Sequence, residues 1–243
     1  MLTYDFQYKD AHRNPSEKLG AFAEVIDREA EQYAIASIAV ATGPIALGEA
    51  AINTYIHSLE TLVNNEALYS PDFIKEFKAH MTETVEHLNS TLFSAGQRLH
   101  VHPIMSLTAV AVGPDGQASF CQAGNTIAIL CNQEKTFLAT QPMTNEKDLK
   151  KAGMSTFPID RTTITALGIN HMIFPKFTKT VLTEESNVFL LSSGFTIDMS
   201  RTMDVISNTK AKAALPEILI KAISESRGLA CSDAVLSIHP TLK

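Results

Sequence analysis

Residues 106–131 read SLTAVAVGPDGQASFCQAGNTIAILC, three short apolar runs separated by residues that favour turns. The runs span 106–112, 117–123 and 126–131, and their β-branched and small apolar residues are typical of buried strands. The tetrapeptide GPDG between the first two runs combines the proline and glycines that a tight reversal needs. The stretch therefore predicts three consecutive strands that pair as an antiparallel meander.

Upstream of this stretch, the sequence predicts one buried strand followed by two long helices. The run AIASIAVA at 34–41 is short and apolar, as in a strand covered on both faces. Apolar residues then recur at three- and four-residue steps from Gly48 to Val63, which indicates an amphipathic helix. A second helix follows Ser70 and Pro71, with the serine as its cap and the proline in its first turn.

Downstream, strands and helices alternate less regularly. The patterns predict a short helix at 144–153, a strand or turn at 162–168, a buried strand at 187–193, helices at 197–207 and 211–227, and a last strand at 234–238. Because strands come in runs and helices are grouped, the order favours an α+β fold in which helices cover both outer faces of a sheet sandwich. The length of 243 residues suits a single domain over 1–243.

The composition is that of a folded, acidic protein. Hydrophobic residues make up 45% and charged residues 19%, and the net charge of −6 argues against nucleic acid as a partner. We find no signal-peptide pattern and no apolar run of about 18 residues, so we expect no membrane association and a cytoplasmic location. The three cysteines, an odd number set far apart among apolar residues, are expected to be reduced core thiols: Cys121, Cys131 and Cys231.

Common enzyme motifs find no support. The segment Gly43–Glu49 follows a strand and opens a helix, as a phosphate-binding loop does. However, Glu49 and Ala50 stand where such a loop needs lysine and then serine or threonine. The sequence also lacks GxSxG, GxGxxG and paired CxxC motifs, so nucleotide binding and these hydrolase or redox classes are not predicted.

The spacing of some histidines is compatible with a metal site but only weakly indicates one. His80, Glu83 and His87 share one side of the second long helix, but such residues usually form a solvated helical face, and we prefer that interpretation. His100 and His102 flank one valine before a proline, which indicates a surface loop.

The most informative pattern is spread along the chain. The segments, in order, are YKDAH (8–12), VATG (40–43) followed by GEAA, SLTAVAV (106–112), CQAGNTIAIL (121–130), TALG (165–168), FLLSSGFTIDMS (189–200) and CSDAVLSI (231–238). This succession resembles the metal-dependent PPM-type (type 2C) serine/threonine protein phosphatases. In that family the corresponding stretches contain Arg-x-x-Asn-x-Asp-Ala, Asp-Gly-x-Gly-Gly, Val-Gly-Asp-Ser-Arg, Ala-Leu-Gly, Ser-Asp-Gly and Asp-Asn-x-Thr.

The resemblance implies a specific architecture and chemistry. It implies a four-layer αββα sandwich, in which two antiparallel sheets are flanked by helix pairs and a metal cleft lies at one edge. It also implies hydrolysis of phosphate esters by water activated between two divalent metals, Mg²⁺ or Mn²⁺, held by the aspartates of the motifs.

This sequence departs from the family at most of those aspartates. Asp10 matches the first acidic ligand and Gly43 keeps a backbone-carbonyl position, but hydroxyl residues replace three aspartates: Thr42, Ser193 and Ser232. Asp198 follows Ser-Ser-Gly at a distance that matches a further acidic position of the family. Asp233 is adjacent to Ser232, yet alternation along a strand would turn its side chain to the other face.

Other substitutions disable the same cleft. Asp5 stands where the family has a phosphate-binding arginine, so a cation has become an anion. Asn125 and Ile127 replace the aspartate and arginine of Val-Gly-Asp-Ser-Arg, and Pro44 removes a backbone donor.

The lost charge is large compared with metal affinity. One unit charge at about 4 Å contributes roughly 4 kcal/mol at an effective dielectric near 20. Three lost carboxylates therefore remove on the order of 10 kcal/mol, whereas millimolar to micromolar binding represents roughly 4–8 kcal/mol. We expect that the two-metal centre does not form and that the protein needs no cofactor.

The leading prediction is a pseudophosphatase: a catalytically inactive, phosphatase-like protein that serves as a protein-binding or regulatory module. It assigns no catalytic and no metal-binding residue. The remnant of the cleft comprises Asp10, Thr42, Gly43, Asn125, Ser193, Asp198 and Ser232.

Two alternatives remain open. One is a working phosphatase with an altered Mg²⁺ or Mn²⁺ site, for example a single metal near Asp10 and Asp198. The other is a small-molecule sensor, in which the hydroxyls of Thr42, Ser193 and Ser232 bind a polar ligand in the vacated cleft.

Overall fold

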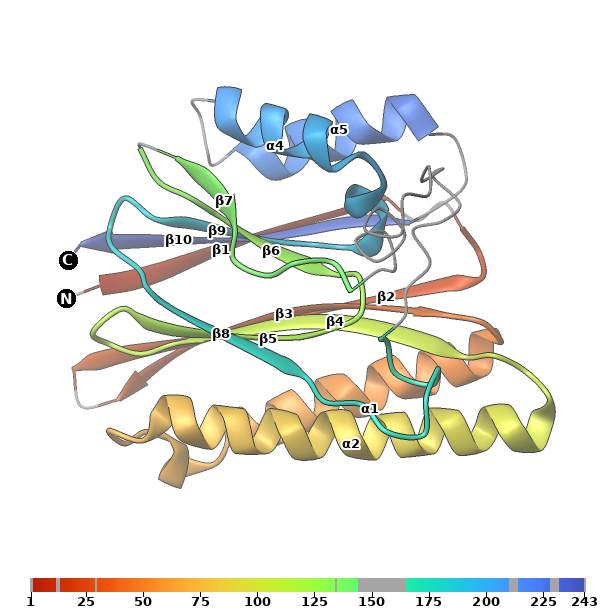
Figure 1. Cartoon of the computed structure of the whole chain (residues 1–243). Coiled ribbons are helices and arrows are strands. Elements are labelled where there is room, and N and C mark those ends of the chain that lie inside the picture. Colours follow the sequence, from red (N-terminus) through yellow and green to blue (C-terminus); the bar gives the residue numbers. More distant parts are fainter. Residues whose placement is uncertain are drawn as a thin grey trace, which may run out of the picture.

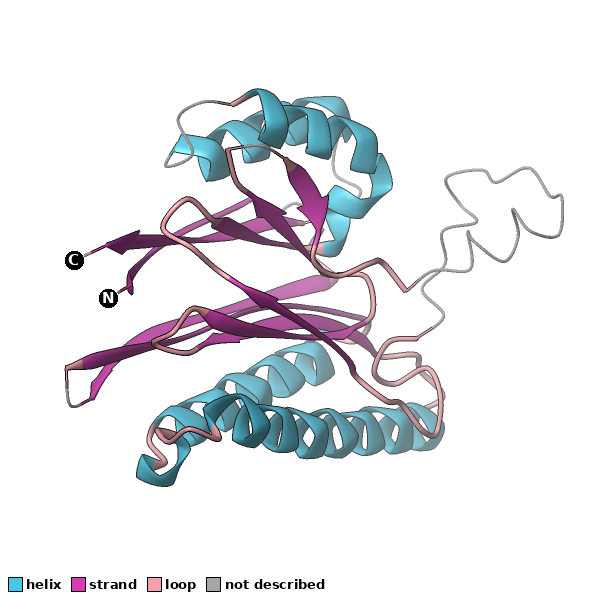
Figure 2. Ribbon diagram, turned by 60° about the vertical axis from the view of Figure 1, so that its left-hand side comes forward, coloured by secondary structure: helices cyan, strands magenta, loops and turns pink. Residues whose placement is uncertain are grey.

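The computed structural model describes residues 2–11, 14–28, 30–133, 135–143, 165–209, 214–227 and 232–242. In this part of the chain two antiparallel five-stranded sheets lie face to face, and helices cover both outer faces (Figure 1). Figure 2 shows the same four layers from another side. The predicted α+β sandwich of two antiparallel sheets between helix pairs is confirmed.

The first sheet has the order β1-β10-β9-β6-β7 and joins the two ends of the chain. Its strands are β1 (Leu2–Ala11), β10 (Asp233–Leu242), β9 (Asn187–Leu191), β6 (Ile127–Cys131) and β7 (Thr136–Leu138). The helices on its outer face are α4 (Met199–Asn208) and α5 (Leu215–Arg227), with the 3-10 helix η3 (Ser193–Asp198) leading into α4.

The second sheet has the order β2-β3-β4-β5-β8. Its strands are β2 (Glu17–Arg28), β3 (Glu31–Thr42), β4 (Ile104–Val112), β5 (Gln117–Ala123) and β8 (Lys176–Val181). The helices on its outer face are α1 (Ile45–Val63) and α2 (Phe73–Leu99), connected through the 3-10 helix η1 (Glu66–Leu68).

Strand β3 is buried on both faces, which explains its continuous apolar sequence. Ile35 and Ala39 pack in the core beneath α1 and α2, whereas Ala36 and Ile38 pack in the core between the sheets. Alternation along the strand assigns these neighbours to opposite faces. On the helix side, Tyr55 of α1 and Ser37 share a buried hydrogen bond, and burial raises the pKa of Tyr55.

The predicted meander is only partly correct. β4 and β5 form the expected hairpin around Gly113–Gly116, but β6 leaves this sheet and pairs with β9 in the other. The outer edge of β5 is taken by β8, so β6 has no place beside it. The crossing begins at Gly124, which has φ +92°, and a Cβ there would lie 2.2 Å from the Ser106 hydroxyl. Only glycine fits this turn.

The second helix begins later than the sequence predicts. Asp72 occupies the N-cap position and Phe73 starts α2, so Pro71 lies before the first turn. The Ser70 hydroxyl accepts a hydrogen bond from the amide of Asp72, which makes it part of the preceding turn.

Strands β1, β2, β7 and β8 were not predicted. They lie at or near sheet edges, where partial exposure interrupts the alternation of apolar and polar residues. The predicted helix at 144–153 and residues 162–164 fall outside the described residues. Within the described ranges, no helix is long and apolar enough to cross a bilayer.

Asn89 of α2 holds the segment that follows the Ala-Leu-Gly motif. Its side-chain amide donates to the carbonyls of Asn170 and His171 at 3.0 and 3.1 Å, and its oxygen accepts from the amide of Gly168 at 2.9 Å. Asn89 is 2% exposed, so its side chain supplies hydrogen bonds to these backbone groups in a place that water does not reach.

We predict that Asn89→Ala lowers the free energy of unfolding by about 2–3 kcal/mol, because buried backbone groups lose their partner. Urea denaturation followed by circular dichroism measures the change. Glu86→Ala, on the exposed face of the same helix, serves as the control and should change stability by less than about 0.5 kcal/mol. Equal effects of the two substitutions would show that Asn89 does not anchor the segment.

Candidate functional site

The two sheets meet at the end of the molecule where β3 ends and β10 begins. Thr42 is the last residue of β3 and pairs in register with Glu17, the first residue of β2. The carboxylate of Glu17 accepts a hydrogen bond from the amide of Ser232, which directly precedes β10 in the other sheet. Glu17 and Ser232 are both buried, so this contact connects the two sheets inside the protein.

Ser232 is held on several sides. Its hydroxyl accepts from the amide of Asn14 at 3.2 Å, and its carbonyl accepts from the hydroxyl of Ser192 at 3.3 Å. The same Ser192 oxygen accepts from the amide of Ala234 at 2.9 Å. Two of the hydroxyl-substituted motifs, Ser192-Ser193-Gly194 and Ser232-Asp233, are thus brought side by side.

Asp233 lies on the face of β10 that is turned away from the space between the sheets. Ala234 packs between the sheets and Val235 packs under α4 and α5, so Asp233 shares the outer face with Val235. A Cβ on Gly194 would lie 2.2 Å from the Asp233 carboxylate, which places that carboxylate against the start of η3. The structure therefore agrees with the predicted alternation at this point.

Asp10 lies near the end of β1, opposite Ala234 of β10. Its carboxylate accepts a hydrogen bond of 2.8 Å from the hydroxyl of Tyr8. Burial, together with this hydrogen bond and the charge of Asp10, raises the pKa of Tyr8. Tyr8 therefore remains a neutral donor to Asp10 at physiological pH.

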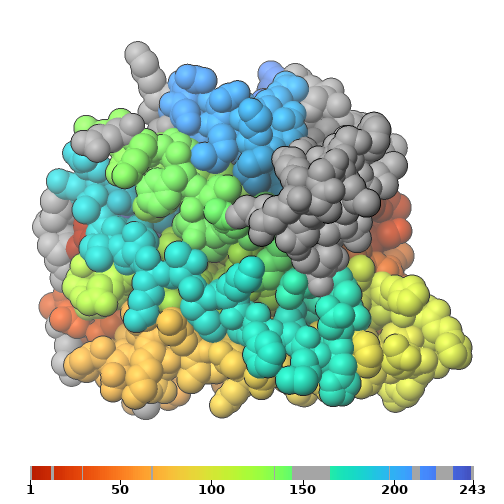
Figure 3. Space-filling model, in the orientation of Figure 1, coloured from red at the N-terminus to blue at the C-terminus, as the bar shows by residue number. Residues whose placement is uncertain are grey.

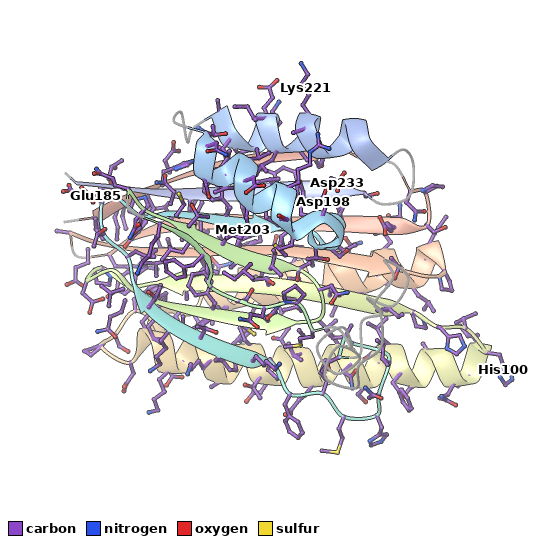
Figure 4. The ribbon with its side chains drawn as sticks, turned by 45° about the horizontal axis from the view of Figure 1, so that its top comes forward. His100, Glu185, Asp198, Met203, Lys221 and Asp233 are labelled. Atoms are coloured by element: carbon purple, nitrogen blue, oxygen red, sulfur yellow. The ribbon has the colours of Figure 1, made fainter. Side chains whose placement is uncertain are left out.

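Asp198 acts as the N-cap of α4, where its side chain accepts from the amide of Arg201 at 3.3 Å. Figure 4 shows Asp198 at the start of this helix. Asn125 is buried and directly follows Gly124 in the turn. Its backbone amide donates a hydrogen bond to the hydroxyl of Ser106 at 3.1 Å.

Gly43 has φ +121° and lies against the loop before β4, since a Cβ there would be 3.0 Å from the Cα of Pro103. Pro44 follows as the N-cap of α1, and no side chain caps this helix. Because proline has no backbone N–H, Pro44 offers no donor to an anion at the start of α1.

The described side chains do not fit a two-metal centre. Hydroxyls occupy three ligand positions of the resemblance, Glu17 binds a backbone amide, and Asp198 caps a helix. Across the described ranges, no three His, Cys, Asp or Glu side chains form a group that could hold a metal ion. Mg²⁺ and Mn²⁺ favour carboxylate oxygens, and the described carboxylates at this end of the sandwich do not converge into such a group.

Glu17 was not identified from the sequence. It lies in EKLGAFAEVIDR, a segment whose charged residues resemble those of an exposed strand, and its carboxylate contacts a residue 215 positions away. No local signal in the sequence identifies such a contact.

The positions of the histidines indicate structural roles or exposure to solvent. The Nε2 atom of His80 lies 2.8 Å from the Ser58 hydroxyl and 3.0 Å from the Ser58 carbonyl, so His80 connects α2 to α1. Desolvation lowers the pKa of His80. Glu83 and His87 are exposed. His100 is the C-cap of α2 and has a left-handed backbone conformation. Figure 4 shows His100 at the end of that helix. Cys121 and Cys131 are buried free thiols, and Cys231 lies outside the described residues.

Comparison with known proteins gives matches at the level of structure. No protein-family model and no curated protein sequence matches the chain. The serine/threonine phosphatase of S. agalactiae superposes with a TM-score of 0.78 at 17% identity, covering 98% of this chain and 99% of the other. The catalytic domain of the phosphatase PstP, solved with two manganese ions, gives 0.75 at 16% identity over 100% of both chains.

A third neighbour, the serine/threonine phosphatase Stp1 of Staphylococcus aureus, gives a TM-score of 0.71 at 13% identity and covers 100% of this chain and 96% of its own. These identities are low, so the matches establish the fold and leave the chemistry of this chain to its own residues. The chain is built on the PPM-type serine/threonine phosphatase fold that its motifs resemble.

Proposed function

We propose that this protein is a catalytically inactive, phosphatase-like module that acts by binding another protein. The observation that carries the proposal is the contact between the Glu17 carboxylate and the Ser232 amide. In the family, the residue matching Ser232 is an aspartate that holds a metal. Here a backbone amide of that residue is bound instead, by a carboxylate from the opposite sheet.

Electrostatics supports this proposal. A charge-assisted hydrogen bond to a buried carboxylate is stronger than a neutral one. The hydrogen bond between Glu17 and Ser232 therefore stabilises the contact between the two sheets without a cation. Hydroxyls at Thr42, Ser193 and Ser232 add no negative charge that would offset the cost of dehydrating Mg²⁺ or Mn²⁺. The scaffold is retained while the groups needed for metal chemistry are replaced, which favours a role in binding over a role in hydrolysis.

An exposed apolar pair supplies a candidate surface for the partner. Met172 and Phe174 are 65% and 66% exposed, and they belong to the segment that Asn89 anchors to α2. Figure 3 shows the segment that begins at residue 165, in teal, at the surface beside α2. Exposed large apolar side chains that belong to one segment can form an interaction surface.

The first prediction concerns metal. Titration of the wild-type protein with MnCl2 in a calorimeter should give no binding heat up to millimolar concentration, and Mn²⁺ should not stimulate hydrolysis of an aryl phosphate. The reason is that hydroxyls stand at three of the ligand positions and that Glu17 and Asp198 bind backbone amides. Metal-stimulated turnover that Asp10→Ala abolishes would instead establish the alternative, a phosphatase with an altered metal site.

The second prediction restores the carboxylates. The triple variant Thr42→Asp, Ser193→Asp, Ser232→Asp should bind Mn²⁺ and be stabilised by it, since ligand binding to the native state raises the melting temperature. The matched control replaces the same three residues by asparagine and should show no Mn²⁺ effect.

Ser232→Asp alone should lower the melting temperature in EDTA by roughly 4–8 °C, because it adds a carboxylate beside that of Glu17. Glu17→Gln in this background should recover most of the loss. An additive result for the two substitutions would show that Glu17 does not contribute charge to the cleft.

A further prediction concerns the partner. Affinity capture from the native cell, followed by mass spectrometry, should recover a protein with the wild type that is lost with Met172→Ser, Phe174→Ser. Leu99→Ser, a substitution at another exposed apolar residue, is the control and should retain it. Equal recovery by all three proteins would move the partner surface elsewhere, and no specific recovery by any of them would contradict the binding function.

A further inference from the structure

A cavity of about 650 Å³ lies at the end of the sandwich opposite the cleft. It is bordered by the turn between β2 and β3, the turn between β4 and β5, and the connection between α1 and α2. Strand β3 spans the distance between the two sites, from Glu31 at the cavity to Thr42 at the cleft. Eleven steps along a strand correspond to roughly 35 Å, so the cavity is separate from the phosphatase cleft.

One wall of the cavity is aromatic. The ring centroid of Tyr33 lies 4.8 Å from that of Phe73 and 5.2 Å from that of Tyr69, in edge-to-face arrangements. Tyr33 and Phe73 are buried, and the Tyr69 hydroxyl donates to the carbonyl of Val63. The three rings therefore support one another and are fixed before any ligand arrives.

Carboxylates surround this wall, and two of them are held in place. Glu31 accepts a 3.0 Å hydrogen bond from the hydroxyl of Tyr33. Asp115 accepts from the amide and the side chain of Gln117 at 3.0 and 2.7 Å. Among the described residues that line the cavity, Glu66 adds a third negative charge, against the one positive charge of Arg28.

Arg28 shows which group the aromatic wall accepts. Its guanidinium lies 5.2 Å from the centre of the Tyr69 ring, within the range of a cation–π interaction. A guanidinium is planar and donates in pairs, so it can stack on a ring and bind a carboxylate at its edge.

From this combination we infer that the cavity binds a ligand that carries a guanidinium group. The ligand stacks its guanidinium on the aromatic wall and pairs with the carboxylates of Glu31 and Asp115. The volume is typical of small-molecule and side-chain pockets. The group can come from a free alkylguanidine or from an arginine side chain of another protein. The inference does not depend on the proposed function, because no residue of the cleft takes part.

The test measures binding to the whole protein by isothermal titration with three probes: agmatine, the peptide Gly-Arg-Gly and putrescine. Agmatine or Gly-Arg-Gly should bind, and putrescine, a cation without a guanidinium, should bind at least tenfold more weakly. Tighter binding of agmatine indicates a free ligand, and tighter binding of the peptide indicates a protein arginine. Equal binding of putrescine, or no binding of either guanidinium probe at 10 mM, would overturn the inference.

Variants assign the binding to this cavity. Glu31→Gln with Asp115→Asn should weaken guanidinium binding about tenfold, whereas Glu49→Gln with Asp204→Asn removes the same charge from exposed positions elsewhere and should leave it unchanged. Arg28→Ala should tighten binding severalfold, because it removes a like charge and the competitor for the Tyr69 ring. A loss of affinity in Arg28→Ala, with the fold intact by circular dichroism, would contradict the proposed placement.

Discussion

The burial of β3 on both faces is the constraint on which the rest of the structure depends. One face of the strand supports α1 and α2, and the other forms the core against the second sheet. A shift of register by one residue would exchange the two faces, so the packing fixes the strand along its whole length. The same strand carries Glu31 at one end and Thr42 at the other, and its position thereby places both the cavity and the cleft.

The contact between Glu17 and Ser232 connects the two sheets at one end of the sandwich. In the neighbour solved with two manganese ions the fold is the same. Here Glu17 in one sheet reaches the amide of Ser232 in the other, and Ser192 and Asn14 complete the contacts around that residue. Hydrogen bonds among protein groups thus join the two sheets at this edge.

Much of the fold could be predicted from local patterns. The helix that became α1, the strand β3 and the hairpin of β4 and β5 have strong periodicity and clear turn residues, and their positions agree with the prediction to within a few residues. The strand that pairs with β6 could not be predicted, because an apolar sequence is compatible with a place in either sheet. Edge strands such as β8 were missed because their exposed residues leave little apolar signal.

The sequence by itself determined which groups are present: hydroxyls at Thr42, Ser193 and Ser232, and the order of motifs that corresponds to the fold. Only the tertiary structure decided which groups meet. The Glu17 carboxylate reaches Ser232 across 215 positions, and the cavity combines residues 28–33, 66–74 and 113–117, which come from three separate connections. Such contacts depend on strand register and on the packing of two sheets, which are set by the whole core and not by any local segment.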